Sequence, residues 1–187
     1  FADPSKPTLL SSIQLAAYGG FVNSLAVSNG KLAAAIEAVD KQAAGKVVVF
    51  NTSNYSEVKV IAVGALPDMI TYSPDGKYIL TANEGEPSGD YNIDPEGSIS
   101  VIEFVDGIPS DTSINLDFTG YNGKQADLEA QGMHFPNPAG RTINGTLIST
   151  TVAQDLEPEY ITTTDDMAYV TLQENNGIAI VDLTDNS

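Results

Sequence analysis

The sequence predicts an all-β fold, a β-propeller built from a repeated four-stranded unit, on two observations. Three stretches each form a short strand that ends in a tight turn, at residues 23–31, 68–77 and 159–166. Each is followed by a second strand and then by a third strand that begins at glycine. The second strands are expected at residues 32–38, 78–84 and 168–174, and the third strands at residues 45–50, 97–102 and 177–182.

Each element has local support in the sequence. The strands are short, rich in Val, Ile, Tyr and Thr, and separated by turn residues. Asn29-Gly30 and Asp75-Gly76 predict type I′ hairpin turns, in which both central residues have positive φ. We expect a fourth strand at residues 58–63 and again at 114–118. Two further elements are predicted, a fourth strand of another unit at residues 12–16 and a short helix at residues 125–131.

The whole chain, residues 1–187, is interpreted as one partial propeller domain. Because propellers typically have four to eight blades, about three blades indicate a fragment of a larger propeller of the seven-bladed type. The expected partner is then the rest of the same propeller, and association of several copies is the alternative. The expected parts are one blade at 18–63, a second at 66–118, an inserted loop at 119–156 and an incomplete blade at 157–187.

The composition excludes some classes of function. The chain has 25 acidic and 8 basic residues and a formal net charge of −17. Such a surface repels nucleic-acid backbones and anionic lipid, so neither nucleic-acid binding nor direct membrane insertion is expected. The charge suits divalent cations or cationic partners, and simple solubility is the alternative explanation. The chain has no cysteine, which excludes disulfides and thiolate metal sites.

Acidic residues gather where the long connections between strands are expected. In the aligned repeats, Asp68 and Glu159 fall at the start of the innermost strand, and Glu84 and Glu174 fall at the end of the second. These ends meet at one mouth of the propeller channel, and converging oxygen ligands suit Ca²⁺. Solvated acidic loops that never converge are the alternative. The expected metal ligands are Asp68, Glu84, Glu86, Asp94, Glu96, Asp155, Glu157, Glu159 and Glu174.

No catalytic or substrate-binding residue stands out. His134 is the only histidine, and no Gly-x-Ser-x-Gly motif accompanies it, so we expect an incidental loop residue.

Several segments resemble a bacterial propeller family described as "choice-of-anchor I". They include Asn83-Glu-Gly-Glu86 and residues 7–28, 94–98, 155–161 and 171–176, and the resemblance covers almost the whole chain. It implies a secreted or surface-attached bacterial protein whose propeller extends beyond this chain. Some members of the family are described as atypical alkaline phosphatases or phytase-like esterases. The acidic positions that the resemblance implies are Glu84, Glu86, Glu96, Asp155, Glu157, Glu159 and Glu174.

These features favour a non-enzymatic extracellular module that binds calcium through an acidic face and displays that face to a surface ligand. The alternative is a calcium-dependent phosphoesterase, in which clustered carboxylates hold metal ions that bind a small phosphoester and activate water. Whether the protein is an enzyme stays open at this stage. A glycan-binding propeller is the weakest alternative, because tryptophan would be expected at its mouth and the chain has none.

Overall fold

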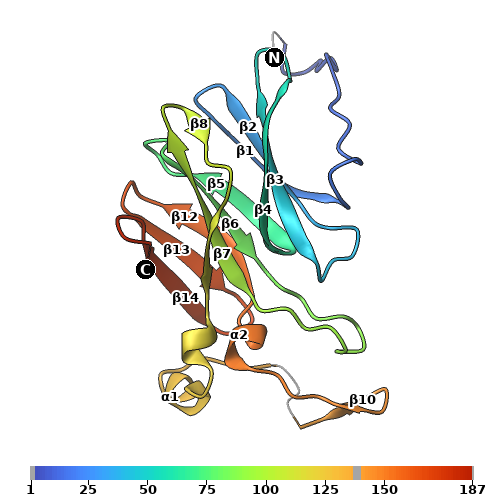
Figure 1. Cartoon of the computed structure of the whole chain (residues 1–187), viewed down its shortest axis with the longest axis vertical. Helices are drawn as coiled ribbons and strands as arrows, with labels where there is room; N and C mark the ends of the chain where they lie inside the picture. Colours follow the sequence, from blue (N-terminus) through green and yellow to red (C-terminus); the bar gives the residue numbers. More distant parts are fainter. Residues whose placement is uncertain (1–2, 137–139, 187) are drawn as a thin grey trace.

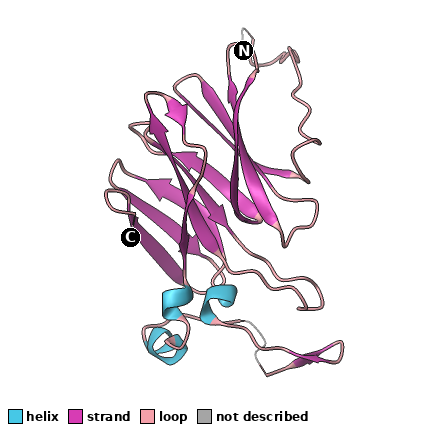
Figure 2. Cartoon of the chain, viewed as in Figure 1, coloured by secondary structure: helices cyan, strands magenta, loops and turns pink. Residues whose placement is uncertain are grey.

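The computed structural model describes residues 3–136 and 140–186, and it is an all-β structure. Four antiparallel sheets and a few short helices make up the described part (Figure 2). Three of the sheets are large and lie one behind another in chain order, from the first near the N-terminus to the third near the C-terminus (Figure 1). The all-β prediction is therefore confirmed.

The first sheet has four strands in simple chain order, each antiparallel to its neighbour. Most residues of its second and third strands are buried. Successive side chains point to opposite faces of the sheet, and both faces are covered by other parts of the molecule. The strands expected in this region are confirmed, with small differences at their ends. They are β1 (Val22–Ser28), β2 (Lys31–Ile36), β3 (Ala44–Asn51) and β4 (Glu57–Ala65).

The second and third sheets repeat this order. The second contains β5 (Pro67–Tyr72), β6 (Tyr78–Asn83), β7 (Ser98–Val105), the short β8 (Ile108–Pro109) and β9 (Ile114–Asp117), which pairs with β7. The third contains β12 (Pro158–Thr163), β13 (Met167–Leu172) and β14 (Gly177–Asp182). The innermost strands β1, β5 and β12 lie next to one another in that order.

Two apolar layers hold the three sheets together. Between the first and second sheets, Val47, Ile61 and Ile79 are fully buried. Between the second and third, Val101 and Val170 are fully buried in a larger cluster. Burial of such side chains provides the main favourable free energy for stacking the sheets.

The glycines at or next to the start of the third strands β3 and β7 have a steric role. A Cβ atom added at Gly97 would lie 1.9 Å from the carbonyl oxygen of Leu156, and one added at Gly45 would lie 2.4 Å from Cδ of Pro67. Pro67 begins the innermost strand of the next sheet, and Leu156 lies just ahead of the innermost strand of the third. The glycine thus allows each sheet to approach the next closely.

One of the two predicted type I′ turns is confirmed and the other is wrong. Asn29 and Gly30 both have positive φ, of 46° and 72°. At the second turn Gly76 has a φ of 74°, but Asp75 is not among the residues with positive φ. The Gly76 N–H donates to the carbonyl oxygen of Ser73, so Pro74 and Asp75 are the central residues. Proline holds φ near −65°, which suits a type I turn and excludes its mirror image.

The prediction of a strand at residues 12–16 is wrong. These residues form no strand, and Ile13 and Leu15 instead pack on a cluster at the first sheet that includes Ile36 and Phe50. A fourth strand needs a free sheet edge to bond with. The free edge of β14 lies on the other side of the molecule from this segment (Figure 1).

The connection between the second and third sheets has structure of its own. The predicted helix is confirmed as α1 (Gln125–Ala130), which follows a single 3-10 turn at Thr119–Tyr121. The sequence did not predict the small hairpin of β10 (Thr142–Ile143) and β11 (Thr146–Leu147), nor α2 (Val152–Asp155). Residues 137–139 of this connection lie outside the described residues.

Candidate acidic binding site

Five of the predicted acidic residues line one cavity, which we call the acidic pocket. Its volume is about 310 Å³, and Pro87, Tyr91 and Pro136 complete its wall. The carboxylates come from the connection after β6, from the end of α2 and the residues that follow it, and from the turn between β13 and β14. Segments far apart in the sequence therefore meet here. The acidic residues are Glu84, Glu86, Asp155, Glu157 and Glu174.

Burial and mutual repulsion make two of these carboxyls weak acids. The pKa of Glu84 is raised to about 7, first by burial and then by the charges of Glu86 and other nearby carboxylates. The pKa of Glu157 is raised to about 8, again first by burial and then by the charge of Glu84. A buried carboxylate close to others of the same charge favours its neutral form. Both groups are therefore partly protonated near neutral pH.

Two more predicted residues border the acidic pocket. Asp68 and Glu159 are half-buried, and burial raises the pKa of each. The charges of Glu174 and Asp68 raise the pKa of Glu159 further. Neither residue lines the pocket, but the charges of both raise the pKa of Glu84, which does.

The last two predicted residues occupy different surroundings. Burial and the nearby charge of Asp155 raise the pKa of Asp94 to about 6, while a hydrogen bond of 3.4 Å from Thr150 opposes the shift. Glu96 is exposed and lies beside another cavity, together with Pro95 and Asp117. The structure therefore does not bring Glu96 together with the other carboxylates.

A short helix positions part of the site. Thr151 and Gln154 form a reciprocal capping box at the start of α2, which satisfies backbone groups that the helix start leaves unpaired. The Gln154 side chain also donates a hydrogen bond of 2.6 Å to the carbonyl oxygen of Asp94. The Gly97 N–H donates to the carbonyl oxygen of Ala153. These contacts hold α2, and with it Asp155, against the second sheet.

Asn175 is a site residue that the sequence reasoning missed. Its side chain is fully buried, and Nδ2 donates to the carbonyl oxygens of Asp155 (2.8 Å) and His134 (3.0 Å). Its Oδ1 accepts a hydrogen bond of 3.4 Å from the Glu157 N–H. This one amide thus joins three segments that form the acidic pocket. Asparagine is common in turns, so its place between two strands gave no separate signal.

Two further residues lie beside the pocket, and one of them is His134, which the sequence analysis treated as incidental. His134 donates its backbone N–H to the carbonyl oxygen of Asn175, and its Nδ1 lies 3.1 Å from the carbonyl oxygen of Glu174. Lys41 forms an exposed ion pair of 3.3 Å with Glu86. His134 therefore fastens the inserted connection to the turn between β13 and β14, and Lys41 partly offsets the negative charge.

The donor set determines what the acidic pocket can bind. It offers carboxylate oxygens, which suit hard cations such as Ca²⁺ or Mg²⁺ and not soft metals. Among residues 3–136 and 140–186, no three acidic or histidine side chains already stand close enough together to hold one metal ion. A cation bound here would therefore have to draw the carboxylates closer.

Comparison with known proteins relates the whole chain to one family. The family model described as the choice-of-anchor I domain matches residues 1–187. None of the curated proteins compared with the chain matches it. In the described part of the chain, no helix is both long and apolar enough to cross a membrane.

Proposed function

The chain belongs to the choice-of-anchor I domain family, and from that premise we propose that it is part of a bacterial surface-associated β-propeller that binds Ca²⁺. The cation binds in the acidic pocket. The bound ion stabilises the channel-mouth loops, which the protein presents to an extracellular ligand. The fold, the pocket and the family each support one part of this proposal.

The propeller architecture is supported by the repetition of the sheets. The first three strands of each large sheet follow one another in chain order, and β1, β5 and β12 lie side by side. In a propeller, the innermost strands of successive blades surround a central channel in this way. The missing blades belong to the rest of the same propeller, which is the partner that we propose.

Calcium binding is supported above all by the five carboxylates that line one cavity. Burial and repulsion by neighbouring carboxylates raise the free energy of the charged forms of Glu84 and Glu157. A divalent cation removes that repulsion, and six to eight oxygen ligands of flexible geometry meet the requirement of Ca²⁺. Glu84, Glu86, Asp155, Glu157 and Glu174 would hold the ion.

A calcium-dependent phosphoesterase is the second candidate. One observation favours it: the pKa of Glu157 of about 8 keeps this carboxyl partly protonated at neutral pH. A carboxyl in that state is suited to act as a general acid. In this candidate Glu157 is not a ligand, and a metal ion held by the other carboxylates of the pocket would supply the positive charge that a phosphate group needs.

The two candidates are separated by one experiment on the intact protein. Phosphomonoester hydrolysis is measured after treatment with a chelator and again after Ca²⁺ is restored, and calorimetry measures Ca²⁺ binding in parallel. Binding without hydrolysis supports the binding module. Hydrolysis that vanishes with the chelator and returns with Ca²⁺ supports the enzyme. A protein that is folded and binds no Ca²⁺ contradicts both.

A further inference from the structure

The third sheet has three strands, whereas the first has four and the second has five. β14 pairs with β13 along one side, and among the described residues no strand pairs with its other side. In the first and second sheets, β3 and β7 hold the same place as β14. Each of them pairs with an additional strand, β4 and β9 respectively.

The free edge of β14 presents regularly spaced backbone donors. The Leu183 N–H donates to the carbonyl oxygen of Asp166, which sets the alternation of hydrogen bonds along the pair of strands. By this alternation the N–H groups of Ala179 and Val181 point toward β13. Those of Ile178, Ile180 and Asp182 point away from it, along the free edge, where another strand could accept them as partners.

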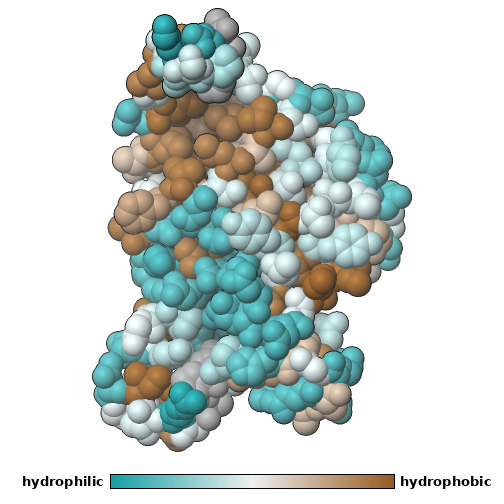
Figure 3. Space-filling model, turned by 180° about the vertical axis from the view of Figure 1, so that it is seen from behind, coloured by the Kyte–Doolittle hydropathy of each residue, from teal (hydrophilic) through white to brown (hydrophobic). Residues whose placement is uncertain are grey.

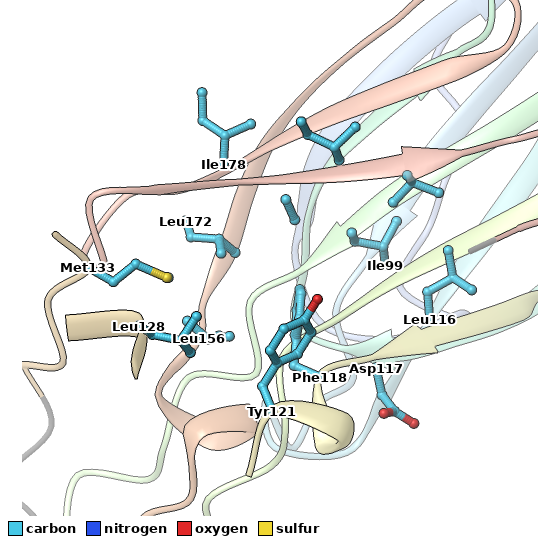
Figure 4. Close-up of a pocket in the computed structure, with 13 residues that line it drawn as sticks. Ile99, Leu116, Asp117, Phe118, Tyr121, Leu128, Met133, Leu156, Leu172 and Ile178 are labelled. Carbon is cyan, nitrogen blue, oxygen red and sulfur yellow. The ribbon is translucent and has the colours of Figure 1, made fainter. Parts of the chain in front are cut away.

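An apolar cavity of about 390 Å³ lies beside this edge. Figure 4 shows Leu116, Phe118 and Tyr121 on one side of the cavity and Leu172 on the other, and Val181 of β14 also lines it. Ile178 and Ile180 of β14 also line this cavity, and they are exposed by 63% and 60%. The edge therefore combines unpaired backbone groups with exposed apolar side chains.

The turn after β14 shares a backbone feature with the turn after β3. Four residues beyond Asn51 at the end of β3, Tyr55 has a φ of 60°, and the chain then enters β4. Four residues beyond Asp182 at the end of β14, Asn186 has a φ of 57°. A left-handed residue at the same place indicates the same reversal of direction, back along the free edge.

We propose that the free edge of β14 pairs with an antiparallel fourth strand from the same protein molecule, entered through the turn at residues 183–186. This strand carries apolar residues at alternate positions. Their side chains point to one face of the third sheet and fill the cavity. β4 shows the pattern, because Ile61 and Val63 are buried while Ala62 between them is exposed. The proposal rests on the propeller architecture given above and does not depend on the acidic pocket.

Hydrogen exchange in the intact protein tests this pairing. We expect the amides of Ile178, Ile180 and Asp182 to exchange as slowly as those of Ala179 and Val181, which bond to β13. The amide of Gly89, in the long connection after β6, is the rapidly exchanging reference. The rates are measured at two protein concentrations tenfold apart, with and without a calcium chelator.

The outcomes are distinct. Slow exchange of the three amides at both concentrations supports the proposed strand. Exchange as fast as that of Gly89 overturns the pairing. Protection that appears only at the higher concentration also overturns the proposal, since the edge would then bind a second copy. If exchange stays slow in the presence of a chelator, the strand pairing does not depend on bound Ca²⁺. A failure of the calcium proposal would then leave the proposal of the fourth strand standing.

Discussion

Glu84 and Glu157 line one cavity, where burial and then the charge of Glu84 raise the pKa of Glu157 to about 8. Glu84 directly follows a strand of the second sheet, and Glu157 directly precedes a strand of the third. The repulsion between them therefore acts across the boundary between two sheets. Anything that neutralises it, whether a proton or a cation, stabilises that boundary.

The first prediction concerns pH in the absence of metal. The folded-state pKa values of Glu84 and Glu157, about 7 and 8, lie above the unfolded value of 4.5. Between pH 4.5 and about pH 8, the folded protein thus binds more protons than the unfolded chain. The free energy of unfolding therefore falls as the pH rises through this range. We expect Tm to fall from about pH 5 to about pH 8. Glu157→Gln should flatten this decline, and a Tm that rises over the range would mean that the two pKa values are not raised in the folded protein.

The second prediction concerns Glu159, which borders the acidic pocket. Glu159→Gln should reduce the increase in Tm that Ca²⁺ produces, and it should leave the metal-free Tm unchanged or slightly higher because it removes a charge that Glu174 and Asp68 repel. The exposed Glu96 lies beside a different cavity, so Glu96→Gln is the matched control and should leave the calcium effect intact. Equal losses of Tm with and without Ca²⁺ would mean that Glu159 has only a structural role.

The third prediction concerns Asn175. Asn175→Ala removes the donor to the carbonyl oxygens of Asp155 and His134 and leaves buried groups without this partner. The expected loss is about 3 kcal/mol in the free energy of unfolding. Asn115→Ala, at an exposed position on β9, should change it by less than about 0.5 kcal/mol. Chemical denaturation measures both, and similar effects of the two changes contradict the role given to Asn175.

The fourth prediction concerns the close approach of neighbouring sheets. Gly97→Ala places a Cβ atom 1.9 Å from the carbonyl oxygen of Leu156, so the backbone must shift. The expected cost is about 1–3 kcal/mol in the free energy of unfolding. Gly89→Ala meets nothing within 4 Å and should be nearly neutral. Thermal unfolding of the two variants compares them, and no loss in Gly97→Ala contradicts the packing described.

The repeat made the sheets predictable from the sequence, because local turn chemistry and alternating apolar residues determine short antiparallel strands. Asn29-Gly30 is an example, since its residues suit positive φ. At Asp75-Gly76 the preceding Pro74 is one of the two central residues, so the turn is of type I and not of the predicted type I′. Residues 12–16 have a strand pattern, but pairing depends on a free edge elsewhere in the fold, which local sequence does not reveal.

The candidate site was predictable only in part. Glu84 and Glu174 hold equivalent places in the repeat, so their shared location followed from the alignment of the strands. Glu96 was grouped with them because it lies in the same long connection, yet that connection carries it to a different cavity. Asn175 was missed because its importance comes from three segments that meet only in the folded protein.

Apolar surface at the other end of the stack agrees with the proposal of further blades. Leu25 and Val27 of β1 are 59% and 67% exposed, and Figure 3 shows apolar side chains gathered on the upper part of the molecule. Exposed apolar patches commonly mark surfaces that another part of a protein covers. Light scattering of the intact propeller should detect a monomer, because these faces would be buried within it.

Calorimetric titration of the intact protein with Ca²⁺ at pH 8 shows whether the acidic pocket binds calcium. We expect a saturable site for Ca²⁺ in the wild-type protein, weakened at least tenfold in Glu84→Gln and in Glu157→Gln but unchanged in Glu96→Gln. A folded wild-type protein that shows no binding, or variants that bind as tightly as the wild type, would contradict calcium binding at the acidic pocket.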